Sequence, residues 1–216
     1  MKYYQWEGIN LICSLLPVIA CGIRFKLLDT ASRVFFVLLS FAFLTECIAC
    51  YAAVKYHNNT AVYNISDLIQ IFLIMLYFNY SILFFRKRNI GLFFGILSSS
   101  FGILNLVYFQ SINVYDNYFF LYQTFLIIIM GIILYRELLL SRYKKVLLDP
   151  HFWLAVALVS FYVFNSFAMS LYDYFTKHIP DQKYLIDDAI IYLNALANIE
   201  FALIFFLYPK MKLRDA

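Results

Sequence analysis

The chain contains 216 residues, of which 64% are hydrophobic and only 14% are charged, and its mean hydropathy is +0.76. Soluble domains have roughly 45–50% apolar and about 25% charged residues, so this composition excludes a soluble globular protein. The net charge of +4 does not indicate nucleic-acid binding, because the basic residues are scattered through short polar segments instead of forming one patch. A helical membrane protein with several spans is the class that remains.

Apolar stretches of membrane-spanning length recur along the whole chain. A span needs ~20 apolar residues, so 216 residues leave room for about seven spans joined by short loops. The sequence therefore predicts an all-α fold, a seven-transmembrane-helix bundle that forms one domain over residues 1–216. The predicted spans cover residues 8–23, 34–54, 68–85, 90–109, 118–135, 151–172 and 188–208.

Three dipeptides predict where individual spans begin. Asp29-Thr30 precedes the second span and has the form of a helix start. Ser66-Asp67 is expected to cap the third span, after a polar loop over residues 55–67. Asp149-Pro150 opens the sixth span with a capping acid and a proline at the first helical position.

The fourth predicted span carries small residues at four-residue spacing, at Gly91, Gly95 and Ser99. This spacing places small side chains on one face of a helix, where they let another helix approach closely in lipid. We therefore expect this face to serve helix packing.

The lysines and arginines predict how the chain is oriented, because cytoplasmic loops carry an excess of them. Thirteen fall in connecting segments on one side: Arg24, Lys26, Arg33, Arg86, Lys87, Arg88, Arg136, Arg142, Lys144, Lys145, Lys210, Lys212 and Arg214. The other side has four: Lys2, Lys55, Lys177 and Lys183. The N-terminus is therefore predicted to lie outside and the C-terminus in the cytoplasm, and we expect a bacterial inner (cytoplasmic) membrane.

Polar side chains inside the spans are the candidates for function, because amides and acids are costly in hydrocarbon. At about 1.5 Å per helical residue, five consecutive spans each place an amide in the outer half of the bilayer. Two glutamates accompany them, one slightly outward of the midplane and one on its cytoplasmic side. The predicted ligand-binding residues are Glu46, Gln70, Asn105, Gln123, Asn165, Asn194, Asn198 and Glu200.

The last span concentrates these groups. At about 100° per residue, Asp187, Asn194 and Asn198 share one face, whereas Glu200 points roughly the other way. We expect the asparagine face to form the wall of a polar chamber that the other helices enclose and that opens to the outside. The alternative is that the amides bond one another across helices and serve packing only.

Neither a cofactor nor a metal is expected. A zinc site needs several ligands at one point, but the histidines fall on both predicted sides of the membrane: His57, His151 and His178. Cys47 and Cys50 have the spacing of a redox pair, although a thiol also packs well within an apolar helix, and we expect packing. A disulfide that joins Cys13 to either of them is left open.

A pattern of short motifs extends along most of the chain. It consists of Thr45-Glu46 in the second span, Asn105-Leu106 followed by residues 110–113, and residues 149–153 at the start of the sixth span. On these residues the chain resembles small bacterial seven-span integral membrane proteins that have no assigned activity. The resemblance implies a membrane input module of the kind that serves sensor kinases.

Three functions are compatible with this pattern. The first is a sensory or ligand-binding module that recognises a small or amphiphilic molecule; only seven residues follow Pro209, so signalling would need a separate partner or a homo-oligomer. The second is an embedded enzyme that acts on lipids or isoprenoids, with Glu46 or Glu200 in acid–base catalysis. The third is a small proton-coupled transporter or channel. Membrane lipids are expected partners in each case, and nucleic acid is not.

Overall fold

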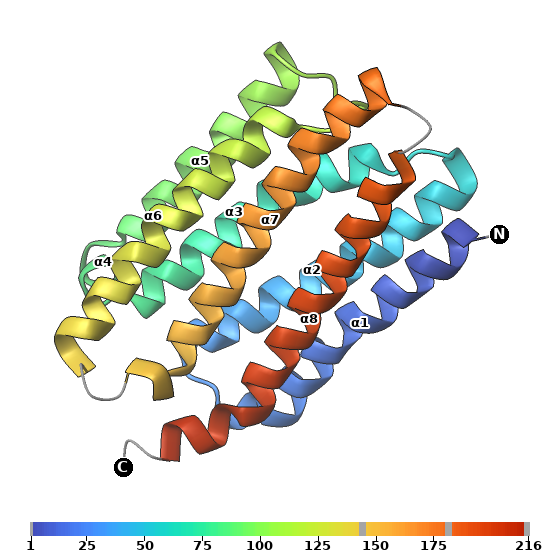
Figure 1. Cartoon of the computed structure of the whole chain (residues 1–216). Helices are drawn as coiled ribbons and strands as arrows, with labels where there is room; N and C mark the ends of the chain where they lie inside the picture. Colours follow the sequence, from blue (N-terminus) through green and yellow to red (C-terminus); the bar gives the residue numbers. More distant parts are fainter. Residues whose placement is uncertain (1, 143–145, 180–182, 214–216) are drawn as a thin grey trace.

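Backbone N–H and C=O groups find no water in lipid, so the apolar stretches of this chain fold as helices that bond these groups internally. The computed structural model describes the backbone of residues 2–142, 146–179 and 183–213 (Figure 1). Side chains are described for residues 8–140, 146–172, 174–175, 178–179, 185–186 and 188–208.

The described residues form α-helices joined by short connections and contain no strand. The helices are α1 (Lys2–Arg24), α2 (Thr30–Tyr56), α3 (Thr60–Ser81), α4 (Leu83–Arg88), α5 (Ile90–Tyr108), α6 (Asn117–Arg142), α7 (Pro150–His178) and α8 (Lys183–Leu213). Single 3-10 turns, Phe25–Leu27 and Val146–Leu148, precede α2 and α7. All helices except α4 are long and apolar enough to cross a membrane, which confirms the prediction of an all-α chain with seven such helices.

Six of the helices form a closed ring. Helix α1 packs against α2 and α8, α2 against α3, α3 against α6, α6 against α7, and α7 against α8. Helix α5 packs mainly on α3, so it lies on the outer side of the ring. The interior of the bundle is therefore enclosed by α1, α2, α3, α6, α7 and α8.

The two ends of the bundle carry different connections (Figure 1). The N-terminus lies at one end together with the α2–α3 and α5–α6 connections, and we call this the N-terminal end. The α1–α2 connection, α4, Val146–Leu148 and the C-terminus lie at the other, the C-terminal end.

Two of the three predicted helix starts are confirmed. The Asp29 carboxylate accepts a hydrogen bond from the Ser32 N–H at 2.9 Å at the start of α2. The Asp149 carboxylate accepts one from the His151 N–H at 2.9 Å, with Pro150 as the first residue of α7.

The third predicted start is wrong, because residues 60–67 are helical. Helix α3 begins at Thr60, so Ser66 and Asp67 lie inside it and do not cap it. Ser66 is buried and its hydroxyl lies 2.8 Å from that of Thr45 on α2. The polar character of this stretch reflects side chains that face the interior of the bundle, not a loop in water.

The predicted third span also ends earlier than expected. Helix α3 ends at Ser81, because Ile82 adopts an extended conformation with φ −99° and ψ 115°. A carboxylate oxygen of Glu137 on α6 accepts a hydrogen bond from the Leu83 N–H at 2.7 Å and marks the start of α4. The basic residues 86–88 thus belong to a separate short helix at the C-terminal end.

The small residues of α5 contact α3, as predicted. A Cβ atom on Gly91 would lie 2.5 Å from the carbonyl oxygen of Met75, so only glycine permits this approach of the two backbones. Gly95 is also buried, and the Ser99 hydroxyl donates to the carbonyl oxygen of Leu68 at 2.8 Å. All four cysteines are free thiols.

Aromatic side chains fill the middle of the ring. The ring of Phe35 on α2 lies 5.0 Å from that of Tyr77 on α3 and 5.2 Å from that of Phe201 on α8, between centroids. Phe205 on α8 completes this group, and all four side chains are buried. We call Phe35, Tyr77, Phe201 and Phe205 the aromatic layer; it separates two polar regions of the interior.

Candidate functional site

A cavity of about 370 Å3 lies inside the ring, on the N-terminal side of the aromatic layer. It extends from Asn59 and Thr60, where α2 joins α3, to Phe35 and Phe201 of the aromatic layer. Its walls come from α1, α2, α3, α7 and α8, with Phe120 from α6 and Tyr115 from the α5–α6 connection. No residue of α5 lines it, in keeping with the position of that helix outside the ring.

The structure brings most of the predicted binding residues to this cavity. Its lining includes Glu46, Gln70, Asn165, Asn194 and Asn198. These side chains come from α2, α3, α7 and α8, so residues far apart in the sequence meet in one space.

The other three predicted residues lie elsewhere. Asn105 donates to a carboxylate oxygen of Asp116 at 2.6 Å and holds the α5–α6 connection. Gln123 donates to the backbone carbonyl of Asp67 at 3.3 Å and ties α6 to α3, as expected for an amide that serves packing. Glu200 does not line the cavity, which agrees with its predicted direction away from the asparagine face. The side chain of Asp187, predicted on that face, lies outside the described residues.

Three amides in the cavity wall donate a hydrogen bond to an earlier residue of their own helix. Asn165 donates to the carbonyl oxygen of Phe161 at 2.9 Å, and Asn198 donates to that of Asn194 at 2.9 Å. A carbonyl oxygen only accepts, so the NH2 group of each amide must face its own helix. Gln70 follows the same four-residue pattern and donates to the Ser66 hydroxyl at 2.8 Å. The side-chain carbonyl oxygens of these amides are left as acceptors.

Two amide oxygens at the cavity are buried without a hydrogen-bond partner among the described residues. They belong to Asn10 on α1 and Asn194 on α8, and both side chains line the cavity. Asn10 is only 8% exposed, so bulk water does not solvate its oxygen. A buried acceptor without a donor costs about 1–3 kcal/mol, and it therefore requires an explanation.

Two acidic side chains also line the cavity, Glu46 from α2 and Asp67 from α3. A carboxylate oxygen of Glu46 accepts from the Tyr63 hydroxyl at 3.1 Å and lies 3.5 Å from the Asn10 Nδ2. The Asp67 carboxylate receives no hydrogen bond from any residue in the described part of the chain. No Lys, Arg or His occurs among the described residues of the lining.

Tyr115 lines the cavity together with both acids. Removal of its phenol from water raises its pKa well above the usual value, and the negative charges of Asp67 and Glu46 are among the groups that act in the same direction. Tyr115 and both acids belong to the lining of the same cavity.

The connection that carries Tyr115 is held by a buried asparagine that the sequence analysis did not single out. Asn64 on α3 donates to the carbonyl oxygens of Ile112 and Val114 at 2.9 and 2.8 Å. Its own oxygen accepts from the Asp116 N–H at 3.3 Å. Asn64 is fully buried, and its bonds fix the α5–α6 connection over the cavity.

Asn10, Asp67 and Tyr115 are lining residues that sequence reasoning missed. Asp67 was assigned to a helix cap, because a polar stretch before an apolar run is typical of a loop. Asn10 lies near the start of the first span, where an amide is also typical of the membrane interface. Asn10 lies between Ile9 and Leu11, and Asp67 directly precedes an apolar run that starts at Leu68; these were signals that pointed to an interior position.

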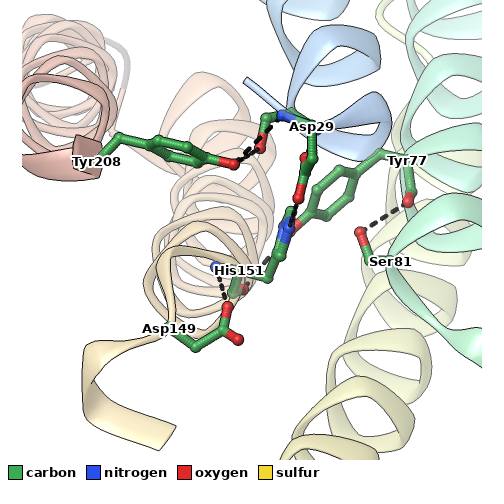
Figure 2. A network of polar contacts seen from close by, with 7 residues as sticks. Asp29, Tyr77, Ser81, Asp149, His151 and Tyr208 are labelled. Atoms are coloured by element: carbon green, nitrogen blue, oxygen red, sulfur yellow. Dashed lines mark hydrogen bonds and ion pairs between the residues drawn. The ribbon is translucent and has the colours of Figure 1, made fainter. Parts of the chain in front are cut away.

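A second polar region lies beyond the aromatic layer, at the C-terminal end. Figure 2 shows His151 at the start of α7 between Asp29, which precedes α2, and Tyr77 on α3. The His151 Nε2 lies 2.8 Å from a carboxylate oxygen of Asp29, and its Nδ1 lies 3.4 Å from the Tyr77 hydroxyl. The Tyr208 hydroxyl on α8 accepts from the Asp29 N–H at 3.4 Å, so four helices meet in these contacts.

Electrostatics favour the ionised form of Asp29 in this region. Partial burial opposes ionisation, but the hydrogen bond and charge of His151, together with the Ser32 bonds, outweigh it and hold the pKa of Asp29 well below its usual value. An ionised carboxylate only accepts, so the His151 Nε2–H is the donor. We call Asp29, His151, Tyr77 and Tyr208 the Asp29 network; its polar groups are bonded to one another.

No family model matches the chain, and no curated protein or solved structure is detectably similar to it. The resemblance to small seven-span membrane proteins, drawn from motifs such as Thr45-Glu46, therefore stays a prediction. The function has to be inferred from the geometry of the cavity.

Proposed function

We propose that this protein is an integral membrane sensory or ligand-binding module whose cavity binds a small or amphiphilic molecule. The observation that carries the proposal is the pair of buried, unpaired oxygens of Asn10 and Asn194 at one cavity. A ligand that donates hydrogen bonds to them removes the cost of their burial. The cavity volume of about 370 Å3 also falls within the range of small-molecule sites, roughly 300–1,000 Å3.

The basic side chains support a cavity on the outer side of the membrane. Those described at the C-terminal end are Arg24, Lys26, Arg33, Arg86, Lys87, Arg88 and Arg136, whereas the N-terminal end has Lys55. By the positive-inside rule, the C-terminal end faces the cytoplasm. The ligand then enters from the outside, and α8 connects its site to the cytoplasmic end, where a separate partner or a second copy receives the signal.

Copurification tests the proposal directly. The full chain is purified in lipid nanodiscs, and bound small molecules are identified by mass spectrometry for the wild type and for Asn194→Leu. Leucine has no acceptor oxygen, so we expect a species that is bound to the wild type and absent from the variant.

The control variant is Leu196→Phe, which changes volume on a side chain of the same helix that is 54% exposed and faces away from the cavity. It should retain the bound species. If the wild type carries no bound species, and if Asn194→Leu and the wild type respond alike in a thermal-shift screen of small molecules, the proposal is wrong.

A second candidate function is an embedded enzyme with two carboxylates in acid–base roles. Glu46 and Asp67 both line the cavity, whereas Glu200, the other acid expected from the sequence, does not. Turnover of a lipid or isoprenoid substrate, lost in both Glu46→Gln and Asp67→Asn while the protein stays folded, would establish it.

A further inference from the structure

The amides of the cavity wall present several acceptor oxygens to the cavity. Gln70, Asn165 and Asn198 turn their N–H groups to their own helices, and the oxygens of Asn10 and Asn194 are unpaired among the described residues. A molecule that donates hydrogen bonds would pair the two free oxygens of Asn10 and Asn194. A ligand that only accepts hydrogen bonds, such as a carboxylate or a phosphate, would leave these two oxygens unpaired.

The charged side chains described in the cavity wall are both acidic. Asp67 and Glu46 line the cavity, and no basic side chain is found among the lining residues that the structure describes. An ionised acid enclosed by a membrane bundle is costly unless a positive charge or several donors accompany it. Asp67 receives no hydrogen bond within the described chain, so it is the group that gains most from a cationic partner.

Aromatic rings make up much of the remaining wall. Phe120 and Tyr162 are stacked with their centroids 5.4 Å apart, and Phe161 lies 5.4 Å from Tyr162. All three line the cavity, together with Tyr115. The faces of aromatic rings attract cations, and their surfaces also accept the apolar body of a ligand.

We propose that the ligand is an organic cation, a protonated amine on an apolar body, whose ammonium group pairs with Asp67 and whose remaining N–H groups donate to the amide oxygens. This inference rests on the proposed function, since it names the chemical class of the molecule that the cavity binds. The amine supplies donors for the unpaired oxygens of Asn10 and Asn194 and a positive charge for Asp67, and its apolar body lies against the aromatic rings.

The test uses matched probes that differ in charge but share one skeleton. The full chain in phosphatidylcholine nanodiscs is titrated with 2-phenylethylamine, 2-phenylethanol and phenylacetate, and with tryptamine and its alcohol counterpart, with empty nanodiscs as the blank. We expect each amine to bind about tenfold more tightly than its alcohol, the ratio that one charge-assisted hydrogen bond supplies, and phenylacetate not to bind.

Two variants separate charge from shape. Asp67→Asn should remove the preference for amine over alcohol, whereas Asn10→Leu, which keeps both acids, should weaken amine and alcohol alike. Glu200→Gln is the matched control, because this carboxylate lies in the same bundle but outside the cavity lining, and it should keep the preference. Monodisperse elution and unchanged helical circular dichroism show that each variant is folded.

The outcomes distinguish this inference from the proposed function. If alcohols bind as tightly as amines, or if Asp67→Asn keeps the amine preference, the ligand is not an organic cation, although the cavity still binds small molecules. If neither amines nor alcohols bind to the wild type, the inference is overturned, whereas the proposed function is overturned only if the copurification and thermal-shift tests also find no ligand.

Discussion

The two polar regions inside this bundle contain similar residue types but use them differently. The Asp29 network pairs its groups with each other, as the 2.8 Å contact between His151 and Asp29 illustrates. The cavity instead leaves the oxygens of Asn10 and Asn194 without partners in the described chain. The aromatic layer, centred on Phe35, lies between them.

This difference distinguishes polar groups that stabilise the fold from polar groups that, in the proposed function, bind a ligand. A satisfied network contributes to stability, because its removal exposes unpaired partners. An unpaired polar group in the cavity wall lowers the stability of the empty protein, and in the proposed function a ligand supplies its partner. Substitutions in the two regions should therefore have opposite consequences, and the following predictions test this contrast.

The largest effect is expected at the boundary between the regions. Phe35→Ala removes a fully buried ring that contacts Tyr77, Phe201 and Phe205. We expect a loss of about 3–5 kcal/mol in the free energy of unfolding, measured by equilibrium unfolding in mixed micelles. The matched control is Phe164→Ala, whose ring is 55% exposed on α7 and should cost far less. Equal losses in the two variants would show that the aromatic layer is not a packed barrier.

The same substitution at two asparagines should change stability in opposite directions. Asn64→Leu breaks bonds to Ile112 and Val114, and we expect it to lower the free energy of unfolding by about 1–3 kcal/mol. Asn194→Leu removes an unpaired oxygen and should raise that free energy by about 1 kcal/mol in the empty protein. If both variants were destabilised alike, Asn194 would have a structural partner and the contrast between the regions would fail.

Asp29 should contribute to stability in a pH-dependent way. Because its folded-state pKa is lowered, its contribution is present above the ordinary value of about 3.9 and is lost as the pH falls below it. Melting temperatures between pH 7 and pH 3 should therefore fall less steeply on acidification for Asp29→Asn than for the wild type. Asp29→Ala also removes the cap of α2, the hydrogen bond from the Ser32 N–H. It should lower the free energy of unfolding at neutral pH by a further amount of about 0.5–2 kcal/mol. Parallel curves for Asp29→Asn and the wild type would contradict the ionised state of Asp29.

Local signals predicted the fold well. Apolar length determines which segments cross a membrane, so all seven spanning helices were found from the sequence. Asp29 and Asp149 cap their helices through bonds to residues two or three positions away, which a sequence pattern records directly. Asp67 was misassigned, because a polar stretch beside an apolar one has the same pattern whether it faces water or a cavity.

The membership of the cavity wall could be predicted only in part, because depth along a helix does not determine direction around the bundle. Asn194 and Asn198 were placed on one wall from helical periodicity within a single segment, and both line the cavity. Asn105 has a suitable depth, but α5 packs outside the ring, and this is a property of the tertiary arrangement. Gln123 lies in the ring, yet its amide bonds α3 instead of facing the cavity.

The smallest effect is expected at Glu200, the one membrane-embedded acid of the predicted set that lies outside both polar regions. Its side chain neither lines the cavity nor belongs to the Asp29 network, so Glu200→Gln changes no group that contacts a ligand. 2-Phenylethylamine should therefore raise the melting temperature of Glu200→Gln as much as that of the wild type. The stabilisation free energies in the two proteins should differ by no more than about 0.5 kcal/mol. Because Glu46→Gln alters the cavity wall through an equally conservative change, it should reduce that shift. A larger loss in Glu200→Gln than in Glu46→Gln would mean that the ligand approaches α8 from the opposite face, and the cavity would no longer be the site.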